Sequence, residues 1–232
     1  MSMGIKICCM MTREEVALAA AAGADALGFV SAMPSGPGPI DEALIANLIA
    51  ELPPGPASVL LTSRVLAADI VAQQKRTRAT VLQLVDAVAH DELRRLREAL
   101  PGVALMQVIH VTGPASLDEA VAVAPLVDVL LLDSGNPNAA VRELGGTGRV
   151  HDWSLSRAIV QGAGRPVFLA GGLKSDNVRE AIAAVRPYGV DVCSGVRTNG
   201  RLDPEKLAAF VLAARGVFPE RPGFPRAAQE QR

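Results

Sequence analysis

The sequence predicts a single (β/α)8 barrel, a closed ring of eight parallel strands surrounded by eight helices. Eight short apolar runs are each followed by a helical segment, and strict alternation of this kind is typical of a parallel sheet covered by helices. The chain has 232 residues, of which 50% are hydrophobic, so it can bury the core of one large domain. The competing architecture is an open doubly wound sheet, but no Gly-x-Gly-x-x-Gly motif follows the first apolar run. The count of β–α units favours the closed barrel.

The first four units are marked by capping and turn signals. Thr12 and Glu15 have capping-box spacing at the start of the first helix, which ends at Gly23. Glycines and prolines between Ser31 and Pro39 indicate a loop. The expected strands are 5–9, 24–30, 57–61 and 79–84, and the expected helices are 12–23, 41–52, 65–75 and 90–100.

The last four units contain the clearest buried strand, because the apolar run from Val127 ends in Asp133. Ser175 is expected to cap the seventh helix, and Pro204 lies in the first turn of the eighth. The expected strands are 103–109, 127–133, 166–170 and 190–193, and the expected helices are 116–124, 153–162, 175–185 and 203–216. The barrel domain thus covers residues 1–216, and the polar, Pro-rich residues 217–232 are expected to form a flexible C-terminal tail.

Composition argues against several classes of function. A net charge of −1 with scattered Lys and Arg argues against a nucleic-acid groove or a polybasic membrane patch, and 3% aromatic residues argue against base stacking. No apolar stretch is long enough to cross a bilayer, and the N-terminus lacks the pattern of a signal peptide. The three cysteines form no Cys-x-x-Cys motif and no metal-ligand spacing with the three histidines. We therefore expect a reducing, cytoplasmic setting and no metal site.

Active sites in (β/α)8 barrels lie at the C-terminal ends of the strands, so the residues found there are the candidates. These are Cys8 or Cys9, Ser31, Gln83, His110, Asp133, Gly171 with Gly172, and Ser194 with Gly195.

Two of these candidates, Cys8 and Asp133, can act as a proton-transfer pair. A free thiol titrates near ~8.5 and a free aspartate near ~3.9, so the thiol pKa must fall and the carboxyl pKa must rise for the two to serve as base and acid. The alternatives are that Cys8 is a buried small hydrophobe and that Asp133 only caps a turn. Cys9 is expected to face the helices, because adjacent strand residues point to opposite faces.

The glycine-containing loops after the seventh and eighth strands are candidates for a phosphate site. Backbone N–H groups and helix N-termini in these loops commonly bind phosphate in this fold. A tight turn is the simpler explanation for Gly171 and Gly172 alone, but their position in the barrel favours phosphate binding.

Several short motifs follow one another in a characteristic order along nearly the whole chain. They are Lys6-Ile7-Cys8 with Thr12, the segment from Ala22 to Val30, Gln83-Leu84, Leu131-Leu132-Asp133-Ser134, Gly145-Gly146-Thr147-Gly148, Asp152-Trp153, the segment from Leu169 to Leu173 with Asn177-Val178, and Val190-Asp191-Val192 with Ser194-Gly195-Val196. This ordered set resembles the phosphoribosylanthranilate isomerase family of tryptophan biosynthesis.

The resemblance implies an Amadori rearrangement of N-(5-phosphoribosyl)anthranilate to 1-(2-carboxyphenylamino)-1-deoxyribulose 5-phosphate, with no metal or organic cofactor. It implies a phosphorylated small molecule as substrate. From composition we expect no nucleic-acid or membrane partner, and we expect a monomer or homodimer. A loop from Gly145 to Gly148 would fold over the substrate. The roles implied are Cys8 as general base, Asp133 as general acid, Gly171, Gly172, Ser194 and Gly195 at the phosphate, and Gln83, Gly146 and Gly148 at the substrate.

The chain also departs from the family pattern at four places. Cys9 stands where a glycine is usual, Val85 where a histidine is usual, and Arg197 where a glutamate is usual. Residues 35–39 replace a Ser-Pro-Arg segment whose arginine meets the anthranilate carboxylate, and Arg64 or Arg149 are candidates to supply that charge.

Two other functions stay open on these departures. A paralogous enzyme could use the same acid–base pair on another phosphorylated sugar or aminosugar, which the altered loop favours. The second alternative is a non-catalytic barrel that binds a sugar phosphate. The retained Cys8 and Asp133 argue against this alternative.

Overall fold

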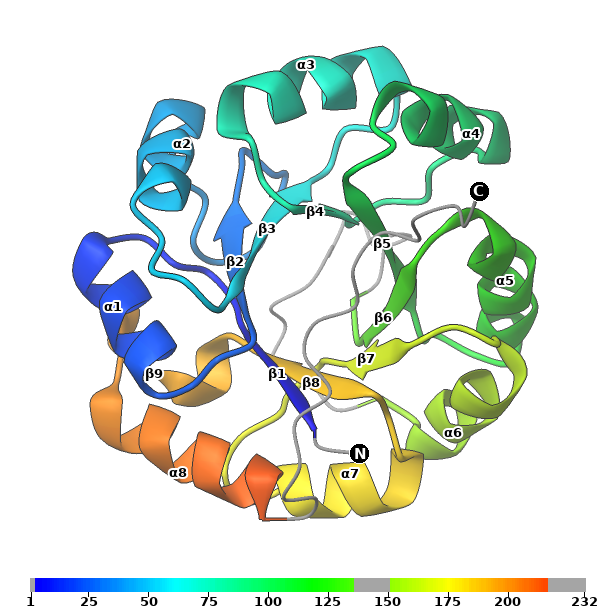
Figure 1. Cartoon of the computed structure of the whole chain (residues 1–232). Coiled ribbons are helices and arrows are strands. Elements are labelled where there is room, and N and C mark those ends of the chain that lie inside the picture. Colours follow the sequence, from blue (N-terminus) through cyan, green and yellow to red (C-terminus); the bar gives the residue numbers. More distant parts are fainter. Residues whose placement is uncertain (1–2, 136–150, 217–232) are drawn as a thin grey trace.

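The computed structural model describes residues 3–135 and 151–216 and contains the predicted barrel. Eight parallel strands follow one another around the ring in sequence order, and β8 pairs back onto β1 to close it. Figure 1 looks along the barrel, with the strands in the centre and the helices around them. The strands are β1 (Gly4–Ile7), β2 (Ala26–Val30), β3 (Ala57–Thr62), β4 (Val81–Leu84), β5 (Ala104–His110), β6 (Val129–Asp133), β7 (Val167–Leu169) and β8 (Gly189–Val192).

One α-helix follows each strand, as expected. The helices are α1 (Arg13–Ala21), α2 (Glu42–Ala50), α3 (Ala67–Thr77), α4 (His90–Ala99), α5 (Ala115–Val123), α6 (Trp153–Gly162), α7 (Val178–Val185) and α8 (Pro204–Arg215). Asp203 caps α8 by accepting hydrogen bonds from the N–H groups of Glu205 and Lys206.

The predicted start of α7 at Ser175 is wrong, because the helix begins at Val178 with Asn177 at its N-cap. The Asn177 side chain accepts from Lys174 N at 2.9 Å and donates to Gly172 O at 3.0 Å. These bonds hold residues 172–177 in a compact loop, which delays the helix. The first strand likewise ends at Ile7 and not at Cys9.

Four short elements were not predicted. Two are 3₁₀ helices, η1 (Ala124–Leu126) and η2 (Ser194–Val196), and two are the paired strands β9 (Arg197–Thr198) and β10 (Arg201–Leu202). Elements of two or three residues are too short to show a hydrophobic period in the sequence.

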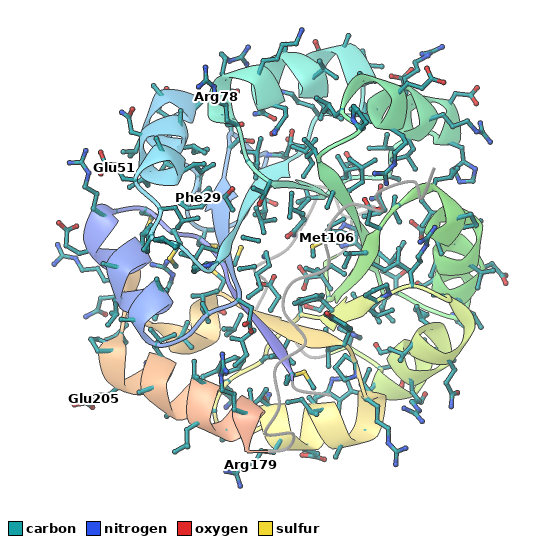
Figure 2. All side chains as sticks on the ribbon, viewed as in Figure 1. Phe29, Glu51, Arg78, Met106, Arg179 and Glu205 are labelled. Atoms are coloured by element: carbon teal, nitrogen blue, oxygen red, sulfur yellow. The ribbon has the colours of Figure 1, made fainter. Side chains whose placement is uncertain are left out.

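The core has two layers separated by the strands. One layer lies between strands and helices and includes Ile5, Ile7 and Phe29, and the other fills the barrel interior and includes Cys8 and Met106. Figure 2 shows Phe29 on the helix side of β2 and Met106 near the barrel centre. Because side chains alternate along a strand, the outward Ile5 and Ile7 leave Lys6 facing the interior.

Two predictions lie outside the described residues. They are the C-terminal tail, residues 217–232, and the loop over the substrate with Gly146 and Gly148. Within the described ranges, no helix combines the length and apolar character needed to cross a membrane.

Candidate active site

A cavity with an empty volume of about 660 Å³ opens at the C-terminal ends of the strands. Six of the residues predicted from the sequence line it, namely Cys8, Gln83, Asp133, Gly171, Gly172 and Ser194. The structure therefore brings the candidate base, acid and phosphate loops around one space.

Cys8 follows directly after β1 and is buried, with 5% of its surface exposed. A hydrogen bond from Cys9 lowers the pKa of the Cys8 thiol, and the Lys6 ammonium lowers it further, against the opposing effect of burial. The thiol is thus biased toward the thiolate, the form that can accept a proton.

Asp133 is the last residue of β6 and is also buried. Burial raises the pKa of its carboxyl group, while a hydrogen bond from Ser134 N to Oδ1 at 2.7 Å and the nearby His110 and Lys6 oppose the rise. Asp133 is therefore biased toward the protonated form. The two pKa values move in the directions that an acid–base pair requires.

Sequence reasoning missed the ion pair of Lys6 with Asp191, in which Nζ and Oδ1 are 2.8 Å apart. Lys6 is completely buried inside the barrel, and Asp191 lines the cavity. Burial alone would lower the pKa of Lys6, but the Asp191 carboxylate reverses this and raises it, so the ammonium stays charged. The sequence did contain a signal for this pair, because Lys6 and Asp191 are each a charged residue in an otherwise apolar strand. Lys6 is also two residues before Cys8 and therefore on the same face of the strand.

The prediction that Cys9 faces the helices is wrong, since Cys9 lines the same cavity as Cys8. Cys9 lies beyond the end of β1 and has a φ of 67°, in the left-handed region. Strand alternation therefore no longer sets its direction. Hydrogen bonds with the Cys193 and Cys8 thiols, together with burial, raise the pKa of Cys9 well above its usual value.

Arg197, another departure from the family pattern, holds this unusual backbone in place. Its guanidinium donates to Cys9 O and forms two bonds with the Glu15 carboxylate, at 2.8 and 3.0 Å. Glu15 also accepts from Met11 N and Leu202 N. The segment after β1 is thus tied to the β9–β10 hairpin.

The glycines of the two candidate phosphate loops differ in whether they line the cavity. Gly171 and Gly172 line the cavity and have φ values of 81° and 64°, which favour glycine. Gly195 is not among the lining residues, and a Cβ there would lie 2.0 Å from Leu173 O. Close packing against this backbone is therefore sufficient reason for a glycine at position 195.

No arginine or lysine stands among the described residues that line the cavity. The Arg64 guanidinium donates to Glu42 on α2 at 3.2 Å, so this candidate for the missing charge is turned elsewhere. The other candidate, Arg149, lies outside the described residues. Met33, Ser35, Gly36 and Pro37 line the cavity on the side of the altered loop.

Three further candidates differ in whether they line the cavity. Gln83 lines the cavity, and its buried Oε1 lacks a hydrogen-bond partner within the described part of the chain. Ser31 Oγ instead donates to Leu61 O at 2.8 Å, and His110 Nε2 is bonded to Val85 O at 3.0 Å, and neither residue lines the cavity. In residues 3–135 and 151–216, no group of His, Cys, Asp and Glu side chains is arranged to hold a metal ion.

Comparison with known proteins gives a consistent result along the chain. The sequence model of a family described as N-(5'phosphoribosyl)anthranilate (PRA) isomerase matches residues 5–213. A curated protein from Methanosarcina mazei, N-(5'-phosphoribosyl)anthranilate isomerase 2, is 38% identical over 218 residues, covering 93% of this chain and 96% of that protein. The corresponding isomerase from Acidithiobacillus ferrooxidans is 39% identical over 214 residues, covering 92% and 98%.

Solved structures agree with these sequence matches. Phosphoribosyl anthranilate isomerase from Thermotoga maritima has a TM-score of 0.80 and 28% identity, covering 92% of this chain and 99% of that chain. TrpF from Jonesia denitrificans has a TM-score of 0.73 and 34% identity, covering 93% and 98%. A phosphoribosyl anthranilate isomerase in complex with reduced 1-(o-carboxyphenylamino)-1-deoxyribulose 5-phosphate has a TM-score of 0.77 and 26% identity, covering 92% and 99%.

Proposed function

The chain belongs to the N-(5'-phosphoribosyl)anthranilate isomerase family, and from this premise we propose that Cys8 and Asp133 carry out the proton transfers of the reaction. The enzyme is an aldose–ketose isomerase of tryptophan biosynthesis, and it converts N-(5-phosphoribosyl)anthranilate to 1-(2-carboxyphenylamino)-1-deoxyribulose 5-phosphate. This conversion needs one group that gives a proton and one that takes a proton, and Asp133 and Cys8 line the same cavity.

Asp133 is the proton donor in the proposed mechanism. It protonates the ring oxygen of the ribose, so that the furanose opens and an imine forms between the sugar carbon and the anthranilate nitrogen. The Cys8 thiolate then removes a proton from the carbon beside the imine, and the electron pair moves toward nitrogen to give the enolamine. Tautomerisation of the enolamine gives the ketose product.

The observation that carries this assignment is the opposite shift of two pKa values at one cavity. The pKa of Cys8 is lowered and the pKa of Asp133 is raised, so each group is shifted toward the protonation state that its role needs. Burial of both groups also keeps water from competing for the protons that they exchange.

The phosphate group is proposed to lie against Gly171, Gly172 and Ser194. These residues line the cavity, and Ser194 begins the 3₁₀ helix η2, where backbone N–H groups are available to an anion. Gly195 supports the site in this proposal by packing on Leu173 O.

Ser194→Asp is expected to raise KM at least about 10-fold, because the new carboxylate would repel the substrate phosphate. A factor of ten in KM corresponds to ~1.4 kcal/mol, and a contact between two charged groups at hydrogen-bond distance is worth more than that. Steady-state kinetics and calorimetry with ribose 5-phosphate are the measurements. Ser175→Asp is the matched control, since Ser175 is exposed in the same region and does not line the cavity. Equal KM values in the two variants would place the phosphate elsewhere.

The carboxylate of the anthranilate lacks a described cationic partner in the cavity. Gly38 lies in the segment that replaces the family's Ser-Pro-Arg and is the position proposed for an arginine, but a Cβ at Gly38 would lie 2.7 Å from Cys9 Cβ. Cys9 therefore occupies the space that a side chain at position 38 needs. A side chain at position 38 therefore needs a smaller residue at position 9, such as the glycine that is usual there in the family.

We expect Gly38→Arg alone to give no gain and the double variant Cys9→Gly/Gly38→Arg to lower KM by roughly 10-fold. A charge-assisted hydrogen bond contributes ~1.5–3 kcal/mol, part of which is offset because Gly38 has a φ of 81°. We expect the change in KM and not in kcat, because the carboxylate is bound about equally in the ground state and in the transition state. Steady-state kinetics of both variants, with Cys9→Gly as the control, is the measurement. A gain from the single variant would refute the steric coupling.

Complementation of a tryptophan auxotroph that lacks the isomerase tests the function as a whole. Growth restored by the wild type and not by Cys8→Ala is the expected result. Growth failure with wild-type protein that is expressed and folded would favour an enzyme acting on another phosphorylated aminosugar.

The proposal also covers assembly and location. One solved relative from Thermotoga maritima is described as dimeric, and for this chain we infer a monomer or homodimer, to be decided by light scattering. Cytoplasmic location is inferred from three cysteines without disulfide partners, which is typical of a reducing compartment.

A further inference from the structure

The cavity contains all three cysteines of the chain, Cys8, Cys9 and Cys193, which we call the thiol cluster. They come from two separate segments, one after β1 and one after β8, and each is unbridged. A catalytic base needs one thiol at most, so the mechanism leaves two of them unexplained.

The strand register makes Cys8 and Cys193 neighbours. Ile7 of β1 pairs with Val192 of β8, and the bond from Cys8 N to Val192 O at 2.8 Å extends the same ladder by one residue. In this ladder, the N–H of a β1 residue donates to the carbonyl oxygen of the residue that precedes its partner on β8. Gly4 is an example, because it pairs with Gly189 and its N–H donates to Tyr188 O.

Paired residues on adjacent parallel strands have backbones about 4.8 Å apart, which is within the ~4.4–6.8 Å that a disulfide spans between Cα atoms. Both residues also line the cavity.

Cys9 is a poor disulfide partner for Cys8. Consecutive Cα atoms in a trans chain are about 3.8 Å apart, which is below the usual disulfide range. The raised pKa of Cys9 also keeps it as a thiol, which is the less nucleophilic form.

We propose that the thiol cluster is a site of reversible oxidation, in which hydrogen peroxide converts Cys8 to a sulfenic acid and Cys193 then closes a Cys8–Cys193 disulfide. In the first step the Cys8 thiolate attacks one peroxide oxygen and releases hydroxide. In the second step Cys193 sulfur attacks Cys8 sulfur, and the sulfenic oxygen leaves as water once it has taken up the Cys193 proton. Cys8 is the sulfur that reacts first, because its lowered pKa gives it thiolate character.

The disulfide form has no thiolate at position 8 and is therefore inactive, a consequence that rests on the proposed role of Cys8. A dithiol reductant returns both thiols and the activity. Bridging Cys8 also protects it from further oxidation to the sulfinic acid, which is not reversed by thiols. Transient, redox-sensing disulfides of this kind are compatible with a reducing compartment.

The test exposes wild-type enzyme to hydrogen peroxide and follows intact mass and activity, each variant being normalised to its own untreated activity. Wild type is expected to lose two hydrogen atoms, to lose activity by a factor on the order of 10²–10⁴, and to recover both with dithiothreitol. Cys193→Ser is expected to gain oxygen atoms at Cys8 and to stay inactive after dithiothreitol.

Two further variants identify the bonded pair. Cys9→Ser retains Cys8 and Cys193 and is expected to form the disulfide. Cys8→Ser retains Cys9 and Cys193, whose thiols are hydrogen-bonded, but it is expected not to form a disulfide because the raised pKa of Cys9 keeps that thiol protonated. A disulfide in Cys8→Ser but not in Cys9→Ser would overturn the proposal, as would full recovery of oxidised Cys193→Ser. Disulfide formation without loss of activity would instead refute the role of Cys8 as base and leave the oxidation site standing.

Discussion

Cys8→Ala is expected to lower kcat by about 10²–10⁴, the usual scale for a positioned acid or base, with little change in the stability of the fold. The expectation rests on the position of Cys8 in the cavity and on the hydrogen bond and charge that lower its pKa. Asp133→Asn is expected to lower kcat by a similar factor, because an amide cannot supply the proton. Single-turnover and steady-state kinetics are the measurements.

Asp128→Asn is the matched control for Asp133→Asn. Asp128 is buried to a similar degree, but it precedes β6 at the opposite end of the barrel, where it accepts from Arg97 at 2.7 Å and Leu105 N at 2.8 Å. Residues at that end of a barrel serve stability and not catalysis, so kcat should be retained while the melting temperature falls. Loss of kcat in both variants alike would mean that the effect of Asp133→Asn is structural.

Cys9→Ala should have an effect on kcat between wild type and Cys8→Ala. Its thiol donates the hydrogen bond that contributes most to lowering the pKa of Cys8, so without it a smaller fraction of Cys8 is thiolate. Strand alternation does not set the direction of Cys9, because Cys9 is not part of a strand.

Lys6→Met is expected to lower the free energy of unfolding by ~3–5 kcal/mol, because it leaves the Asp191 carboxylate buried without its partner. Lys6 is fully buried, and its Nζ lies 2.8 Å from Asp191 Oδ1, so the substitution removes a direct ion pair. Urea denaturation followed by circular dichroism is the measurement.

The double variant Lys6→Met/Asp191→Leu is the control for this effect. Replacing both members of a buried pair with apolar residues is often neutral, so most of the stability should return. A single variant that costs under about 1 kcal/mol, or a double variant as unstable as the single one, would show that the pair does not behave as a buried ion pair.

The fold was predictable because its signals are local. The alternation of apolar runs with capped helices depends on neighbouring residues, and the strands of the barrel lie side by side in chain order. Boundaries were less accurate where a side chain competes for the backbone, as Asn177 does before α7. The hairpin of β9 and β10 escaped prediction because each strand has two residues.

Most of the predicted site residues were found at one cavity for the same reason. In a barrel of parallel strands, the position of a residue at a strand end places it at the mouth, so Cys8, Gln83 and Asp133 could be located from the sequence pattern. The kinetic experiments on the Cys8, Asp133 and Ser194 variants test their roles and those of the phosphate loops.

The sequence alone thus determined which strand ends meet and which acid and thiol line the cavity. Only the tertiary structure decided how those groups are tuned. Lys6 and Asp191 are 185 residues apart in the chain and become partners only when β8 closes onto β1. Cys9 joins the cavity because its backbone leaves the strand conformation, where Arg197 from the far end of the chain holds it. Both features depend on long-range contacts and on a backbone angle that no local pattern of residue types encodes.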